Sequence, residues 1–182
     1  EQTLVMNNLR GRVRLQVDGQ IKTGRDVVIG AMLGADEFGF GTTPLVAMGC
    51  LMMRKCQKNT CPAGIATQDP ALRRQFVGRP EHVENYFHFV AREVREIMAQ
   101  LGVAKFDDLI GHAEYLRKRS GLDGLKAAKL SLEKILYKLP NPKGFPLLST
   151  EPQDHELEKA FDLRYAAELS EALKAKRPMR VQ

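Results

Sequence analysis

The feature that most constrains the fold is a strand–helix–strand pattern near the start of the sequence. Residues 12–17 alternate apolar and polar side chains, which is the pattern typical of β-strands. Residues 37–40 form a second short segment of strand type. Between them, Thr23 and Asp26 have the spacing of an N-terminal capping box. A helix between two strands predicts parallel neighbours joined by a right-handed crossover.

The clearest helix is predicted over residues 80–101. Pro80 is suited to a first helical position, and Gly102 is suited to a C-terminal cap. An apolar stripe at helical spacing runs between them: Val83, Phe87, Val90, Val94, Ile97 and Leu101. Four further helical segments are predicted, separated by a proline- and glycine-rich break at 140–146: residues 45–53, 106–111, 122–138 and 153–177.

Composition excludes two classes of partner. The formal net charge is +6, but the basic residues interleave with acidic ones, which is typical of solvated helix faces, and no nucleic-acid motif accompanies them. We therefore expect no nucleic acid as a partner. No apolar run approaches the roughly 20 residues that span a bilayer, so no membrane is expected. An odd number of cysteines without an export signal favours the cytoplasm.

All three cysteines of the sequence, Cys50, Cys56 and Cys61, are in one short stretch that is followed by Pro62. Three thiolates match a 3Fe–4S cluster, and a proline after the last one is common in cluster loops. A closed zinc site needs four ligands, so a zinc alternative would require His82 or His88 as the fourth. The third alternative is a group of buried free thiols, since free cysteine packs as a small hydrophobe.

Each predicted strand ends in a turn that contains glycine. The first turn is Asp18, Gly19 and Gln20, and the second runs from Gly39 to Gly41 and Thr42. Glycine lets backbone N–H groups approach an anion closely, although either turn alone could be an ordinary bend. The two turns together, followed by the cysteines, predict a site for a phosphate-bearing cofactor.

These segments carry a resemblance to a known family. Residues 18–28, 33–42, 48–50 and 59–69, with the spacing Cys-x5-Cys-x4-Cys-Pro, closely resemble the synthase domain of the glutamate synthase large subunit. The resemblance is strong from residue 1 to about 118 and then thins. Where many flavin barrels have Asp-Gly-Gly in the first turn, this sequence has Gln20 in third place, which is a departure from the family pattern.

The resemblance implies an α/β fold: the last two strands and helices of a (β/α)8 FMN barrel, followed by a mainly helical connecting segment. Residues 1–104 would be the C-terminal part of the barrel, with an iron–sulfur loop at 50–62. Residues 105–152 would be a helical extension and linker, and residues 153–182 would lead into a C-terminal β-helix domain.

The resemblance also implies an activity. Ammonia from glutamine would condense with 2-oxoglutarate to an imine, which FMN would reduce to L-glutamate with electrons relayed by a 3Fe–4S cluster. Cys50, Cys56 and Cys61 would ligate the cluster. The other carried-over positions would surround the ribityl phosphate of FMN: Asp18, Gly19, Gln20, Gly41 and Thr42. No catalytic acid or base is identified.

The partners implied are the glutaminase domain, the rest of the barrel and the β-helix domain, together with an electron-donating subunit or ferredoxin. The electron donor stays open between NADPH, NADH and ferredoxin. Two strands cannot close a barrel that needs eight, so we expect this sequence to be completed by further polypeptide and, by itself, to lack FMN or aggregate. An electron-transfer module without its own substrate is the main alternative function.

Overall fold

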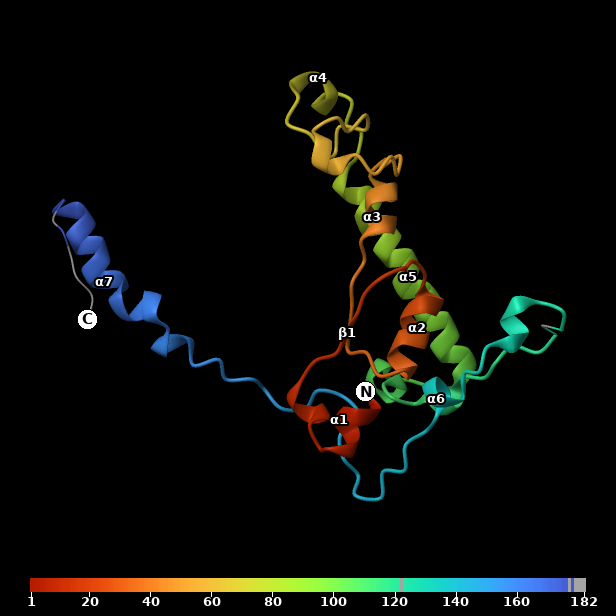
Figure 1. Ribbon diagram of the computed structural model, residues 1–182. Coiled ribbons are helices and arrows are strands. Elements are labelled where there is room, and N and C mark those ends of the chain that lie inside the picture. Colours follow the sequence, from red (N-terminus) through yellow and green to blue (C-terminus); the bar gives the residue numbers. More distant parts are fainter. Residues whose placement is uncertain (122, 177, 179–182) are drawn as a thin grey trace. The chain divides into compact units, whose positions relative to one another are not determined.

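The computed structural model describes residues 1–121, 123–176 and 178. The chain divides into two compact units, Glu1–Thr150 and Glu151–Gln182. The first contains a two-stranded sheet and six α-helices among the described residues (Figure 1): α1 (Gln2–Met6), β1 (Gln16–Val17), α2 (Gly24–Met32), β2 (Glu37–Phe38), α3 (Thr42–Ala47), α4 (Pro70–Arg73), α5 (Pro80–Leu101) and α6 (Glu133–Leu136). The second contains α7 (Phe161–Lys174) and a preceding 3-10 turn, Leu157–Lys159.

The predicted strand–helix–strand unit is present, with shorter strands than expected. β1 and β2 pair in parallel, with Gln16 opposite Glu37 and Val17 opposite Phe38, which confirms the predicted orientation. The prediction of strands over 12–17 and 37–40 is wrong in extent, because each strand has two residues and Arg12 closes a 3-10 turn. The first unit is therefore α/β, mainly helical around a small parallel sheet.

Helix α2 begins with the predicted capping box. The Thr23 hydroxyl accepts a hydrogen bond from the Asp26 N–H at 3.2 Å, and the Asp26 carboxylate accepts one from the Thr23 N–H at 2.9 Å. These reciprocal bonds satisfy two of the backbone donors that a helix start leaves unpaired.

The predicted bounds of α5, Pro80 to Leu101, are confirmed, and Gly102 ends it with the left-handed φ of 73° that favours glycine. Of the predicted stripe, Val90 and Val94 are buried together with Met98, whereas Phe87 is 39% exposed. The buried residues pack against α2 and against the turn after α5 to form the core: Val27, Val28, Ala31, Met32, Val90, Val94, Met98, Leu109 and Ile110.

Gly24 explains how α2 and α5 approach so closely. A Cβ atom at this position would lie 2.7 Å from the Val90 carbonyl oxygen and from the Val94 nitrogen of α5. A distance this short is not tolerated between a side chain and backbone, so only glycine permits the contact. The helices therefore meet backbone to backbone where α2 begins.

Two predicted helices differ from the structure. In place of a helix over 122–138, the described residues form a 3-10 turn at Lys126–Lys129 and the single turn α6; residue 122 lies outside the described residues. Leu130 and Ile135 are 61% and 55% exposed, so the predicted apolar face has no partner, and most helical stability comes from such packing. The helix predicted at 45–53 is α3, which begins earlier, at Thr42, and ends at Ala47.

The last helix is also shorter than predicted. Residues 153–177 were expected to be helical, but α7 starts at Phe161, and residue 177 lies outside the described residues. In the described part of the chain, no helix is both long and apolar enough to cross a membrane.

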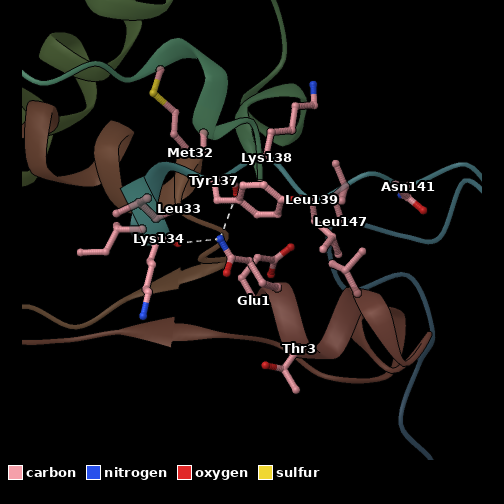
Figure 2. Close-up of a pocket in the computed structure, with 15 residues that line it drawn as sticks. Glu1, Thr3, Met32, Leu33, Lys134, Tyr137, Lys138, Leu139, Asn141 and Leu147 are labelled. Atoms are coloured by element: carbon pink, nitrogen blue, oxygen red, sulfur yellow. Dashed lines mark hydrogen bonds between the residues drawn. The ribbon is translucent and has the colours of Figure 1, made fainter. Parts of the chain in front are cut away.

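The segment around α6 is attached to α1 through Gln2. The Gln2 amide donates hydrogen bonds to the carbonyl oxygens of Lys134 at 3.1 Å and Tyr137 at 2.9 Å, drawn as dashed lines in Figure 2. A cavity of about 380 Å³ lies beside these bonds, and its lining includes Glu1 and Leu33. None of the predicted site residues lines this cavity.

Arg10 is the one charged side chain that is fully buried among the described residues. Its guanidinium donates to the carboxylates of Glu1 and Asp36, each at 2.6 Å, and to the carbonyl oxygens of Val13 at 2.8 Å and Gly34 at 3.0 Å. Burial raises the pKa of Glu1, although the bond from Arg10 opposes this. The buried charge is thus paired on both sides.

Replacing Arg10 by Met is expected to destabilise the protein by about 3–5 kcal/mol, because two carboxylates lose a buried partner. Arg14→Met is the matched control. Arg14 pairs with Glu37 at 3.1 Å on the surface, with its own side chain 73% exposed, so its loss should cost below about 1 kcal/mol. Urea denaturation measures both, and equal losses in the two variants would contradict the assignment.

Candidate cofactor site

The three cysteines line one small pocket. We call residues 50–62 the cysteine loop. The other lining residues of the pocket are residues 51–55 and Pro62 of this loop and the adjacent Ala63. Cys61 is buried, Cys50 is half-buried and Cys56 is exposed. The structure therefore places the three predicted ligands around one pocket, and the residues differ in their exposure to solvent.

Left-handed backbone shapes the cysteine loop. Met52, Arg54 and Asn59 have φ values of 54°, 53° and 57°, a region that is uncommon for residues other than glycine. The Cys50 sulfur accepts a hydrogen bond from the Met52 N–H at 3.4 Å. The chain thus turns back on itself after Cys50, and residues 51–60 stay exposed to solvent.

The Cys61 sulfur lies among backbone donors. N–H groups of the following turn, first that of Ala66 and then those of residues 63–65, lower the pKa of the Cys61 thiol, although burial opposes them. Backbone N–H groups that converge on one atom favour a negative charge there. A thiolate or a sulfide near Cys61 would therefore be stabilised by the main chain.

The three sulfur atoms are not arranged as a closed metal site. Among residues 1–121, 123–176 and 178, no group of three or more His, Cys, Asp or Glu side chains is placed to hold a metal ion. His82 and His88 are exposed on α5, and Nδ1 of His82 accepts the Arg79 N–H at 3.4 Å, as a helix cap does. The donor chemistry suits an iron–sulfur cluster, and the ligand assignment stays a prediction.

Asn59 attaches the cysteine loop to the segment before α4. Its side-chain oxygen accepts from the Gln68 N–H at 2.5 Å and from the Thr67 hydroxyl at 3.1 Å, and its carbonyl oxygen accepts from the same hydroxyl at 2.8 Å. Asp69 then caps α4 by accepting from the N–H groups of Ala71 and Leu72. This chain of bonds fixes the loop from its C-terminal side.

The two glycine turns lie side by side beyond the sheet. The Gly39 N–H donates to the Val17 carbonyl oxygen at 2.8 Å, and a Cβ atom at Gly39 would lie 2.9 Å from Cγ of Asp18. Gly19 and Gln20 have φ values of 92° and 64°. Gln20 therefore adopts a backbone conformation that favours glycine, the residue that many flavin barrels have there.

Neither crowding nor backbone conformation requires a glycine at position 41. Its φ is −108°, which any residue adopts, and no atom lies within 4 Å of the position that its Cβ would take. The chain itself therefore does not require glycine at this position. The open space is suited to a group that must approach the backbone closely.

The N-terminus of α2, by contrast, is filled by side chains of the chain itself. The Gly24 N–H donates to a carboxylate oxygen of Glu93 at 2.7 Å, and the Asp26 carboxylate accepts from the N–H groups of Lys22 and Thr23. A helix N-terminus is generally suited to an anion, but two carboxylates already occupy this one. Any phosphate contact would have to come from the turns.

Sequence reasoning missed Thr43, the neighbour of Thr42. Its hydroxyl oxygen is buried and has no hydrogen-bond partner among the described residues. An unpaired buried hydroxyl costs stability, so its presence at the second turn indicates a missing partner. The Thr-Thr pair after Gly41 was the available signal, since a run of hydroxyls after a glycine turn is suited to an anion.

Comparison with known proteins identifies the family of the chain. Residues 1–104 match the model of a conserved region in glutamate synthase. The chain is 50% identical over 162 residues to the NADH glutamate synthase of Schizosaccharomyces pombe, covering 88% of this chain and 8% of that protein. It is 48% identical over 163 residues to the large chain of the NADPH glutamate synthase of Bacillus subtilis, covering 89% of this chain and 10% of that protein.

A plant relative is similar at the same level. The chain is 46% identical over 156 residues to the ferredoxin-dependent glutamate synthase 1 of Arabidopsis thaliana, covering 86% of this chain and 9% of that protein. The chain thus spans about a tenth of the length of these relatives. It belongs to the glutamate synthase family.

Replacing Asn59 by Ala is expected to loosen the cysteine loop, because the Gln68 N–H loses its acceptor. Amide hydrogen exchange at Gln68 should become about tenfold faster, in line with the loss of one hydrogen bond. Asn59→Asp keeps the acceptor oxygen and tolerates the left-handed backbone, so exchange at Gln68 should stay slow. Similar exchange in all three proteins would contradict this role for Asn59.

Proposed function

We propose that the chain is the cofactor-binding end of the synthase barrel of a glutamate synthase, which makes L-glutamate from 2-oxoglutarate and ammonia derived from glutamine. In this proposal the chain forms the last two strands of a (β/α)8 barrel. Bound FMN would supply hydride transfer and a 3Fe–4S cluster would supply electron relay. The residues of the chain would bind and position these two cofactors.

The observation that carries the proposal is the position of the two glycine turns. Both follow the carboxyl ends of parallel strands, and ligands of parallel α/β folds bind at that edge. Open space at Gly41 and the unpaired hydroxyl of Thr43 fit a phosphate group there. The backbone at Gly41 and the side chains of Thr42 and Thr43 would hold it, with Asp18 and Gly19 on the other side.

The cysteine pocket supports the second cofactor. Three cysteines face one pocket, and a cluster bound by three thiolates carries negative charge. Three basic residues of the same loop, Arg54, Lys55 and Lys58, would offset part of that charge. α3 alone separates the second glycine turn from Cys50. In this proposal the short connection keeps the cluster and the flavin within reach of each other for electron transfer.

The proposed partners follow from the length of the relatives. The remaining nine-tenths of such a chain would supply the glutaminase, the rest of the barrel and the β-helix domain. The relatives are named for NADH, NADPH and ferredoxin, so the donor would be one of these, directly or through a second subunit. We place the protein in the cytoplasm, because its thiols need a reducing compartment.

Replacing Cys50, Cys56 or Cys61 by Ser, one at a time in the complete gene product, should lower cluster iron and remove the visible absorption of the cluster. The reason is that each thiolate would hold one iron. Gln57→Ser is the matched control, since Gln57 is exposed in the same loop and does not line the cysteine pocket; it should keep full iron. Full iron content in all three cysteine variants would exclude the cluster assignment.

Replacing Gly41 by Val should lower the flavin content of the purified protein by about tenfold or more, because a side chain would fill the space that the phosphate needs. No atom of the chain crowds this position, so the thermal unfolding of the apoprotein should change little. Unchanged flavin content would exclude this placement. A protein with cluster iron but no flavin in the parent form would favour the electron-transfer module instead.

A further inference from the structure

Helix α5 contacts the segments that follow both glycine turns through one side chain, that of Tyr86. Its hydroxyl donates a hydrogen bond to the carbonyl oxygen of Lys22 at 2.8 Å, two residues after the first turn. Its ring packs edge to face against Phe40 of the second turn, with ring centroids 6.2 Å apart. Tyr86 therefore contacts the second turn and the segment directly after the first turn.

The sheet does not extend to these contacts. The ladder ends at Val17 and Phe38, and the last backbone bond between the two segments joins the Gly39 N–H to Val17. Beyond it, the distance between Gln20 and Gly41 is not set by strand pairing. Tyr86 is the side chain placed to set it.

The surroundings of Tyr86 hold it in this position. Phe87 packs against both Phe40 and Tyr86, with centroids 5.1 Å apart in each pair, and Tyr86 packs against the buried core. Two helical turns further along α5, the Glu93 carboxylate accepts a hydrogen bond from the Gly24 N–H. The segment from Lys22 to Gly24 is thus attached to α5 at two places, and the ring of Tyr86 packs against Phe40, Phe87 and the core.

We propose that Tyr86 is a positioning residue, which holds the two glycine turns at the separation that a flavin phosphate requires. The proposal rests on the proposed function, because it assigns the phosphate of FMN to these turns. Tyr86 acts through the backbone of Lys22 and the ring of Phe40. Its contribution should therefore be specific to ligands that carry the phosphate.

The test compares FMN with riboflavin, which lacks the phosphate, by titrating each into apoprotein of the complete gene product. The parent protein should bind FMN at least about tenfold more tightly than riboflavin, because charge-assisted hydrogen bonds to phosphate are strong. Tyr86→Phe keeps the ring and removes the hydroxyl. It should weaken FMN binding about fivefold, which corresponds to the net free energy of one hydrogen bond. It should leave riboflavin binding unchanged.

Tyr115→Phe is the matched control, since Tyr115 lies in the 3-10 turn Ala113–Tyr115, away from both glycine turns, and is 46% exposed. It should change neither affinity. Equal weakening of both flavins, or no weakening, in Tyr86→Phe would overturn the role of Tyr86 while leaving the proposed function intact. A parent protein that binds riboflavin as tightly as FMN would overturn the phosphate site, and this inference with it.

Discussion

The buried guanidinium of Arg10 is the interaction on which the first unit depends. It joins the start of the chain, the end of α2 and the start of β2, through Glu1, Gly34 and Asp36. Asp36 in turn accepts from the backbone N–H groups of Leu15 and Ser149. A buried charge must be paired, so these segments meet around the Arg10 guanidinium. Both strands of the sheet, and the glycine turns after them, follow directly from these segments in the chain.

Helix α5 connects this core to the candidate site. Close contact with α2 at Gly24 removes space between the helices, and Glu93 and Tyr86 extend the attachment into the turn segments. The same carboxylate of Glu93 neutralises the helix end that would otherwise attract an anion. The start of α2 is therefore closed to an anion by both packing and charge. The backbone at Gly41, in contrast, stays open.

Local signals in the sequence were sufficient for the elements whose stability is local. Thr23 and Asp26 gave the start of α2, and Pro80 and Gly102 gave both ends of α5, because caps are formed by neighbouring residues. The helix predicted over 122–138 failed because its apolar face found no partner. For the site, the sequence located the cysteines and the glycine turns. It missed Thr43, although the Thr-Thr pair after Gly41 was visible in the sequence. It could not locate Glu93 or Tyr86 as site neighbours, because their roles come from contacts between distant segments.

The exposure of the cysteine loop has a consequence for how such a protein matures. The buried core is built from α2, α5 and the turn after α5, and residues 51–60 contribute nothing to it. Left-handed backbone at Met52 and Arg54 makes the loop costly to order by itself. Within the proposed function, iron and sulfide would reach the cysteine loop from solvent, and the buried core would not have to open for the cluster to be inserted.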